Sequence, residues 1–142
     1  MSAPKLEPGQ SLADCPATKE FRERHEQVAR AAEEHAAQRQ HAKGKGTARE
    51  RIEQLLDNGS FLEVGQFSGS GVGANAKPSG VVTGFGTIDG RQVAVYSQDF
   101  SVQGGSLGSV EGDKIVRLLD DALRLRIPII GLIDSGGAKI QE

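Results

Sequence analysis

The stretch IPIIGLIDSGGA, residues 127–138, joins the most apolar run in the chain to two adjacent glycines. Pro128 imposes an extended conformation on the residue before it, and the apolar residues 129–133 are typical of an interior strand. Gly136 and Gly137 follow where a helix should start. The stretch therefore predicts a buried strand that ends in a glycine corner, the kind of place where open α/β sheets bind ligands.

A hairpin and a long helix precede this strand. Residues 81–88 and 92–97 are strand-like, and between them Asp89 and Gly90 form a dipeptide that tolerates the positive φ angles of a tight turn. Residues 110–126 have a helical pattern with too many apolar positions for one stripe, so we expect a helix covered on more than one side. The order strand, strand, helix, strand predicts an α/β fold.

The second strand of the hairpin, the helix and the strand at residues 129–133 form a β-α-β unit. Such a crossover is right-handed and makes its two strands parallel. The loops that leave these strands, residues 98–109 and 134–139, should therefore open at the same carboxyl end of the sheet.

Both loops contain paired glycines, Gly104 and Gly105 in QGGSLG and Gly136 and Gly137 in SGGA. Glycine lets backbone amides approach a ligand without an intervening β-carbon. Amides at a helix start can bind a phosphate or stabilise a developing oxyanion. Each loop alone is also explained as a tight strand-to-helix turn, but two such loops at one sheet end favour a binding site.

Other candidate groups are weaker. Asp99 and Asp134 end adjacent strands and could form an acid–base pair, although both also fit cap and turn roles. Ser135 lacks the G-x-S-x-G context of a nucleophile and has no base nearby. The histidines all lie in polar helical sequence of the first half: His25, His35 and His41. Chemistry in the second half must therefore use amides, lysine, serine or carboxylates.

The first 60 residues are predicted to be mainly helical. Residues 18–42 are rich in Ala, Glu, Gln and Arg and predict a long surface helix. Thr47 and Glu50 have the spacing of a capping box, which starts a second, short helix. Gly59 suits the left-handed position that ends such a helix. Residues 68–80, SGSGVGANAKPSG, are interpreted as a mobile loop.

The composition indicates a soluble globular protein. The 142 residues carry a net charge of −2 spread along the chain, which gives no electrostatic footprint for nucleic acid or an anionic membrane. No apolar stretch approaches the roughly 20 residues that cross a bilayer, and the N-terminus lacks the apolar core of a signal peptide. Because Cys15 is the single cysteine, a disulfide framework and a multi-cysteine zinc site are excluded. We expect a cytoplasmic protein with no metal, nucleic-acid or membrane partner.

Three long motifs resemble one protein family: GKGTARERIEQLLDNGSF (residues 44–61), SGVVTGFGTIDGRQVAVYSQDFSVQGGSLG (79–108) and PIIGLIDSGGAKIQE (128–142). Together they are similar to the start of the carboxyltransferase (beta) subunit of biotin-dependent acyl-CoA carboxylases of the propionyl-CoA carboxylase type. The resemblance divides the chain into an N-terminal tail and surface helix, residues 1–42, and the start of the acyl-CoA carboxyltransferase N-terminal domain, residues 43–142. Since such subunits are several times longer, we expect this domain to be incomplete at residue 142 and inactive alone.

The resemblance implies a fold and a reaction. The fold is crotonase-like (ClpP/crotonase), a superhelix of β-β-α repeats, here preceded by N-terminal helices. The reaction moves CO2 from carboxybiotin to the α-carbon of a short acyl-CoA such as propionyl-CoA or acetyl-CoA. The biotin is carried by a biotin carboxylase/biotin carrier (alpha) subunit and is not attached to the beta subunit. Beta subunits form homo-oligomers, and the coenzyme A thioester is their substrate.

The resemblance also assigns site residues. The backbone amides of Gly136, Gly137 and Ala138 resemble those of a crotonase-type loop. In the family this loop supplies an oxyanion donor or lines the CoA/biotin pocket. Gly104, Gly105 and Ser106 resemble a neighbouring wall of that pocket. No metal ligand is implied.

Several positions depart from the family pattern, and several functions stay open. The departures are Gly46, Ser79, Gln103 and Lys139. Lys139 stands where Arg is common in SGGAR, and lysine cannot reproduce a bidentate anion contact. The alternatives are another crotonase-like acyl-CoA enzyme, including a hydratase or a serine-type peptidase, a biotin-dependent decarboxylase subunit, and a non-catalytic binding module whose glycines only turn corners.

Overall fold

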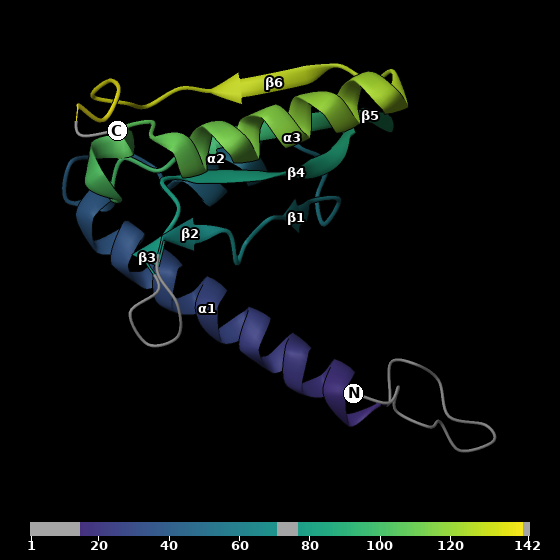
Figure 1. Ribbon diagram of the computed structural model, residues 1–142, viewed down its shortest axis with the longest axis horizontal. Helices are drawn as coiled ribbons and strands as arrows, with labels where there is room; N and C mark the ends of the chain where they lie inside the picture. The colour runs from purple at the N-terminus through teal and green to yellow at the C-terminus, as the bar shows by residue number, and fades with distance from the viewer. Residues whose placement is uncertain (1–14, 71–76, 141–142) are drawn as a thin grey trace.

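The protein is described by a computed structural model for residues 15–70 and 77–140. In chain order the elements are α1 (Pro16–His41), α2 (Ala48–Leu55), β1 (Leu62–Val64), β2 (Gly69–Ser70), β3 (Lys77–Pro78), β4 (Val81–Ile88), β5 (Arg91–Gln98), the 3-10 turn η3 (Gln103–Gly105), α3 (Ser109–Leu125) and β6 (Ile129–Leu132). Four strands form one sheet in the order β1-β4-β5-β6, and β2 pairs with β3. Figure 1 shows α1 extending away from the sheet toward the N-terminus.

β4 and β5 form the predicted hairpin. They pair antiparallel along their full length. Asp89 and Gly90 turn the chain with φ values of 49° and 74°, and two successive positive φ angles match the twist of the flanking strands. After α3, β6 pairs parallel with β5, beginning opposite Ala94 at Ile129. The predicted β-α-β unit is therefore confirmed.

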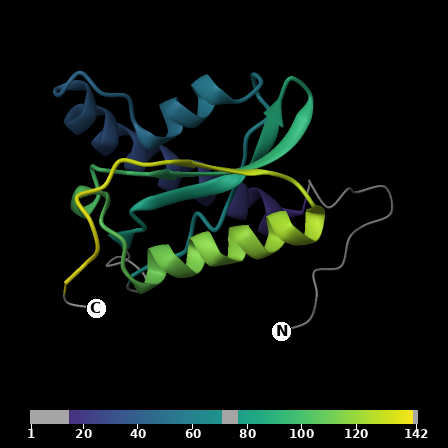
Figure 2. The same cartoon turned by 90° about the horizontal axis from the view of Figure 1, so that it is seen from above.

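Helices cover both faces of the sheet, as the view in Figure 2 shows. Successive residues of β5 point to opposite faces, as in any strand. Val93 and Val95 pack in a cluster with Ile52 of α2, whereas Ala94 packs with Leu118 of α3. Most of β5, including its carboxyl end, is thus buried between helices.

The first two helices follow the prediction at their starts. α1 has Pro16 in its first turn, where the missing N–H costs nothing. α2 has the predicted capping box, with the N–H of Glu50 3.1 Å from Thr47 Oγ1 and the N–H of Thr47 2.8 Å from the Glu50 carboxylate. The prediction that Gly59 ends α2 is wrong. Leu56 leaves the helix in an extended conformation because it is buried in the core, and Gly59 lies in the turn that follows.

α3 and β6 are less covered than the sequence predicts. α3 packs Leu118 and Ala122 against the sheet, but Val116, Leu119 and Leu123 are 54%, 43% and 77% exposed. Within the described ranges, cover on more than one side is therefore a wrong prediction. β6 was expected to be an interior strand, but in the described sheet it lies at the edge beside β5. An apolar run shows which residues favour burial, but not what packs on them.

Residues 68–80, predicted as a mobile loop, include two short strands. Gly69 pairs with Pro78, and Ser70 pairs with Lys77. Residues 71–76 lie outside the described part of the chain. A glycine-rich stretch without alternating apolar residues gives no sequence signal for such short pairing.

Candidate functional site

Two glycine-containing loops meet at the carboxyl end of β5 and β6. We call residues 103–106 the QGGS turn and residues 135–138 the SGGA corner. The N–H of Gly136 donates to the carbonyl of Gly104 at 2.9 Å, which joins the two directly. The prediction that both loops open at one end of the sheet is therefore confirmed.

The contact between the loops continues as a short parallel pairing. Leu107 and Ala138 form an isolated parallel bridge. The N–H of Leu107 donates to the carbonyl of Gly137 at 3.0 Å, and the N–H of Lys139 donates to the carbonyl of Leu107 at 2.9 Å. The SGGA corner thus has a defined register against the chain that follows the QGGS turn.

The QGGS turn is built from three successive left-handed residues. Gln103, Gly104 and Gly105 have φ values of 50°, 67° and 65°. A β-carbon on Gly105 would collide with the carbonyl oxygen of Asp134, so only glycine fits there without a shift of the backbone. Ser106 closes the turn by donating from Oγ to the carbonyl of Gln103 at 2.9 Å. The turn presents a wall against the SGGA corner, and its role in a pocket stays a prediction.

The three predicted oxyanion donors differ in this structure. The N–H of Gly136 donates to the carbonyl of Gly104, and the N–H of Gly137 donates to Ser135 Oγ at 3.0 Å. The N–H of Ala138 donates to no residue in the described ranges, and Ala138 is exposed. The donor role stays a prediction, and in this arrangement it falls on Ala138.

The candidate carboxylates and serine have structural partners. Asp99 is buried and accepts the N–H of Ser101 at 2.9 Å. Asp134 accepts a hydrogen bond from Lys45 Nζ at 3.0 Å. The hydroxyl of Ser135 bonds within the SGGA corner. These contacts support turn and ion-pair roles rather than an acid–base pair or a nucleophile.

Basic side chains from the segment around the end of α1 contact the loop after β5, and the sequence reasoning missed them. Lys43 and Lys45 place their ammonium groups 4.8 and 5.1 Å from the centre of the Phe100 ring. Arg39 donates to the carbonyl of Ser101 at 3.1 Å. The contacts join segments more than 50 residues apart in the sequence, so periodicity gives no sign of them. They bring three basic side chains to the loop after β5, one of which, Lys45, is paired with Asp134.

A buried ion pair beside the SGGA corner was also missed. Glu111 is 3% exposed and accepts a hydrogen bond from Lys139 Nζ at 2.8 Å. The N–H groups of Gly80 and Gly108 donate to the same carboxylate, each at 3.0 Å. Burial raises the pKa of Glu111, but the bonds from Lys139, Gly80 and Gly108 outweigh it, and the pKa lies below its ordinary value. Glu111 stands three residues after Gly108, so its bond to the Gly108 N–H is local, but no sequence signal links it to Lys139.

A second buried charge, Lys114, lies about one turn further along α3. It is 6% exposed, and its Nζ donates to the carbonyl of Val81 at 2.6 Å. Burial lowers the pKa of Lys114 to about 8, against the opposing effect of Glu63, with a further lowering from Arg49 and a smaller raising effect of Glu111. This amine supports the start of β4 rather than the two loops.

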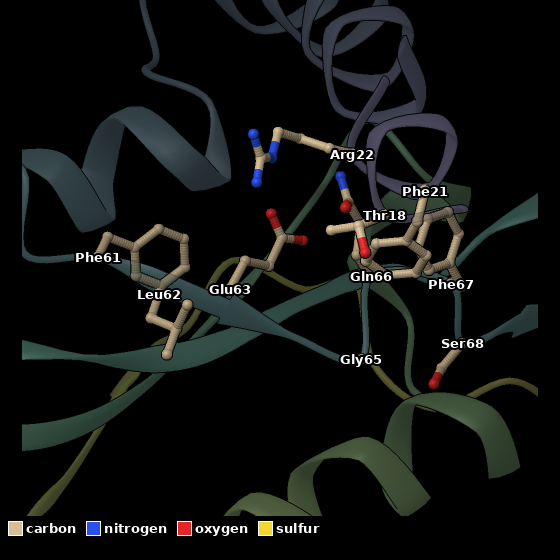
Figure 3. Close-up of a pocket in the computed structure, with 10 residues that line it drawn as sticks. All are labelled: Thr18, Phe21, Arg22, Phe61, Leu62, Glu63, Gly65, Gln66, Phe67 and Ser68. Carbon is tan, nitrogen blue, oxygen red and sulfur yellow. The ribbon is translucent and has the colours of Figure 1, made fainter. Parts of the chain in front are cut away.

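An open groove of about 840 Å³ lies elsewhere, between the start of α1 and residues 61–68 (Figure 3). The rings of Phe21 and Phe67 meet there with their centres 5.7 Å apart. At 1.5 Å per helical residue, Arg22 in the groove is about 25 Å along α1 from Arg39, which contacts the loop after β5. The groove is therefore separate from the two loops.

Possible metal ligands do not gather in the ranges 15–70 and 77–140. No group of three His, Cys, Asp or Glu side chains in these ranges could hold a metal ion. His41 Nε2 lies 2.9 Å from Oε1 of Glu50, a residue of the capping box of α2, at the surface. None of the helices described here is long and apolar enough to cross a membrane. The groups available beside the two loops are N–H donors, lysines and carboxylates.

Comparison with known proteins identifies close relatives. A family model described as the carboxyl transferase domain matches residues 39–142. A propionyl-CoA carboxylase beta chain from Saccharopolyspora erythraea is 53% identical over 128 residues, which is 86% of this chain and 23% of that protein. The methylmalonyl-CoA decarboxylase subunit alpha of Veillonella parvula is 49% identical over 115 residues, 77% of this chain and 23% of that protein.

A solved structure agrees with these relatives. Transcarboxylase 12S, a hexamer with methylmalonyl-coenzyme A and methylmalonic acid bound, matches with a TM-score of 0.75 and 37% identity over 94% of this chain and 27% of its own. The predicted crotonase-like fold class is confirmed by this neighbour. The chain spans about a quarter of the length of these relatives. Sequence and fold agree, and the chain belongs to the carboxyl transferase domain family.

Proposed function

We propose that this chain is part of an acyl-CoA carboxyltransferase subunit, which transfers CO2 from carboxybiotin to the α-carbon of a short acyl-CoA such as propionyl-CoA or acetyl-CoA. The match to the carboxyl transferase domain over residues 39–142 carries the proposal. The relatives support the substrate class, since one is a propionyl-CoA carboxylase beta chain and another holds methylmalonyl-coenzyme A.

The proposal extends to the partners. A biotin carboxylase/biotin carrier (alpha) subunit carries the biotin, which is not attached to this chain. Beta subunits associate with one another, and the transcarboxylase 12S hexamer supports this by similarity. Cytoplasmic localisation stays a prediction of the sequence.

The residues of the two loops fit a carbonyl group whose oxygen becomes negative. Bound carboxybiotin supplies the CO2 for the reaction. The N–H of Ala138 donates to no residue in the described ranges, and a backbone donor that is fixed before the reaction stabilises developing negative charge. Gly136 has no side chain to block the approach of a carbonyl group. Lys45 pairs with Asp134, directly before the SGGA corner, and Lys43 lies over the Phe100 ring in the loop after β5.

Substitution of Gly136 tests the proposal in the full-length protein. A β-carbon at Gly136 would lie 3.6 Å from the carbonyl oxygen of Gly104, an ordinary contact, so the fold should accept it. We expect Gly136→Val to lower carboxylation of propionyl-CoA by about 100-fold, since a bulky group displaces the carbonyl from its donor. Incorporation of labelled bicarbonate, with the biotin carboxylase/biotin carrier (alpha) subunit and ATP present, measures this. Gly137→Val should lose at least as much activity, because a side chain at its φ of 125° also strains the backbone of the corner.

Gly112→Ala is the matched control, because a β-carbon there meets nothing within 4 Å on α3. It should carboxylate like the wild type. Full turnover in both Gly136→Val and Gly137→Val would remove the role that we give to the SGGA corner.

A decarboxylase subunit is the second candidate. The 49% identity to the methylmalonyl-CoA decarboxylase subunit alpha favours it. Both functions exchange CO2 between biotin and an acyl-CoA, but in opposite directions. Release of CO2 from methylmalonyl-CoA without ATP, with no bicarbonate-dependent carboxylation, would assign the decarboxylase.

A further inference from the structure

Glu111 joins three segments that are far apart in the sequence. Its carboxylate accepts the N–H of Gly80, just before β4, and the N–H of Gly108, at the start of α3, each at 3.0 Å. The third donor is Lys139 Nζ at 2.8 Å, directly after the SGGA corner. One charged group therefore connects the sheet, the helix and the corner.

The pair of Glu111 and Lys139 is protected from water. Their side chains are 4% and 16% exposed. Removing one partner of a buried, hydrogen-bonded pair leaves an uncompensated charge, whereas exposed pairs contribute little. Arg124 and Asp121 on the same helix are such an exposed pair, at 3.5 Å with side chains 77% and 48% exposed. The pair of Glu111 and Lys139 should therefore restrain the SGGA corner more strongly than the exposed pair restrains the end of α3.

Lys139 is fixed at two points, through its side chain and through its backbone. Its Nζ contacts Glu111, and its N–H donates to the carbonyl of Leu107 at 2.9 Å. Ala138, the preceding residue, forms the parallel bridge with Leu107. The Ala138 N–H shares its peptide plane with the Gly137 carbonyl, which accepts the N–H of Leu107, and the next peptide is held through Lys139. The direction of the Ala138 N–H therefore depends on both contacts, and Lys139 holds the far side.

We propose that Glu111 is a positioning residue for carboxyl transfer, which acts through Lys139 to hold the N–H of Ala138 against the oxygen that becomes negative. This inference rests on the proposed function, because it requires the SGGA corner to contact the reacting carbonyl. A donor that shifts by about 1 Å loses on the order of 100-fold in rate. A pair that only capped α3 would affect stability and not this donor.

Three variants separate these roles in the full-length protein. Lys139→Met removes the ammonium group but leaves Glu111 to accept the N–H groups of Gly80 and Gly108. Glu111→Gln keeps the shape of the side chain and removes its charge. Lys139→Arg keeps the positive charge and is the rescue variant. Arg124→Met is the matched control, because it removes a cation from an exposed pair on the same helix.

Two measurements are made on each variant. Hydrogen exchange of residues 134–140 reports on the hold of the corner. Turnover with propionyl-CoA, with the biotin carboxylase/biotin carrier (alpha) subunit, ATP and bicarbonate present, gives kcat and KM. For Lys139→Met we expect exchange in the corner to rise about tenfold without change elsewhere. For Glu111→Gln we expect the same rise in the corner together with faster exchange at Gly80 or Gly108, because the amide keeps only one of the two acceptor oxygens. We expect kcat to fall by about 10- to 100-fold, with the KM for propionyl-CoA within about threefold. Lys139→Arg should restore both, and Arg124→Met should behave as the wild type.

Each other outcome has a definite meaning. Unchanged exchange in the corner, or an equal rise along the whole chain, would overturn the positioning role whatever the turnover. A loosened corner with full kcat would overturn it too, together with the role of the SGGA corner in the proposed function. If the wild type exchanges no CO2 but Lys139→Met still loosens the corner, the proposed function fails while the hold of Glu111 on the corner stands.

Discussion

The backbone at Gly105 lies against the carbonyl oxygen of Asp134, so closely that a β-carbon on Gly105 would collide with that oxygen. The end of β6 and the QGGS turn are thus in direct backbone contact. Gly104, the preceding residue, has nearly the same left-handed φ, but its β-carbon would meet only the edge of the Phe100 ring at 4.0 Å. A side chain at Gly104 would cost only the strain of a left-handed φ. A side chain at Gly105 would cost that strain and a collision with Asp134.

Alanine substitutions at these two glycines should therefore differ. We expect Gly104→Ala to lower the free energy of unfolding by about 1 kcal/mol, and Gly105→Ala by about 3 kcal/mol because the backbone must also move. Urea denaturation measures both values. Equal losses would show that the contact between Gly105 and Asp134 does not restrict the turn.

The capping box of α2 should be a separate source of stability. Thr47 is fully buried, and its Oγ1 accepts the N–H of Glu50 and donates to Glu33 of α1. We expect Thr47→Ala to lower the free energy of unfolding by about 1 to 2 kcal/mol, because the N–H of Glu50 loses its acceptor. Thr47→Ser keeps the oxygen and is the control. A similar loss in Thr47→Ser would assign the effect to the methyl group instead.

Lys114 should make stability depend on pH in the alkaline range. Burial lowers the pKa of Lys114 from 10.5 to about 8, and the neighbouring charges are Glu63 on β1, Arg49 on α2 and Glu111 on α3. Below pH 8 the amine is charged in the folded and the unfolded chain, so the folded state carries the full cost of burying it. Between pH 8 and 10.5 only the folded amine loses its proton, and that cost is relieved.

The free energy of unfolding of the wild type, relative to Lys114→Met, should therefore rise by about 3 kcal/mol between pH 8 and 10.5. Urea denaturation at several pH values measures the difference. Lys19→Met, at an exposed position on α1, is the control and should give a curve parallel to the wild type. A parallel curve for Lys114→Met would mean that the amine keeps its proton over this range.

Asp57 should stabilise the hairpin turn in its charged form. Its carboxylate accepts the Thr87 hydroxyl at 2.6 Å and the N–H groups of Gly90 and Asp89 at 2.9 and 3.0 Å. These bonds, led by that of Thr87, lower the pKa of Asp57 below 3.8. Its contribution is complete above pH 3.8 and is lost as the pH falls through the lowered pKa. The acid unfolding curve should lose this component in Asp57→Asn.

Glu53→Gln, at an exposed position on α2, is the control for that experiment and should keep the acid dependence of the wild type. Thermal unfolding at several acidic pH values measures the three curves. Identical acid dependence in Asp57→Asn and the wild type would show that the carboxylate is not needed at the turn.

Local signals in the sequence predicted much of the fold. Asp89 and Gly90 predicted the hairpin, and Thr47 and Glu50 predicted the start of α2, because each pair determines the conformation of its own neighbours. The parallel pairing of β6 followed from the helical crossover, because the helix returns the chain to the end of the sheet where β5 begins. These predictions needed no knowledge of distant contacts.

The sequence could not predict what depends on distant groups. Glycines at positions 136 and 137 indicate where side chains are absent, but not where the N–H groups point, and both N–H groups bond within the protein. Glu111 and Lys139 are 28 residues apart, so no periodicity links them. The exposure of α3 and β6 was also missed, since burial depends on which elements lie alongside.

The different chain distances within the sheet suggest an order of events during folding. β4 and β5 are joined by a two-residue turn, whereas β6 reaches β5 only after the 17 residues of α3. Contacts between near neighbours in the chain form sooner than distant ones. In pulse-labelled refolding we expect β4 and β5 to be protected before β6. The contact between the QGGS turn and the SGGA corner would then form only in molecules whose central hairpin is already paired, so the site matures last.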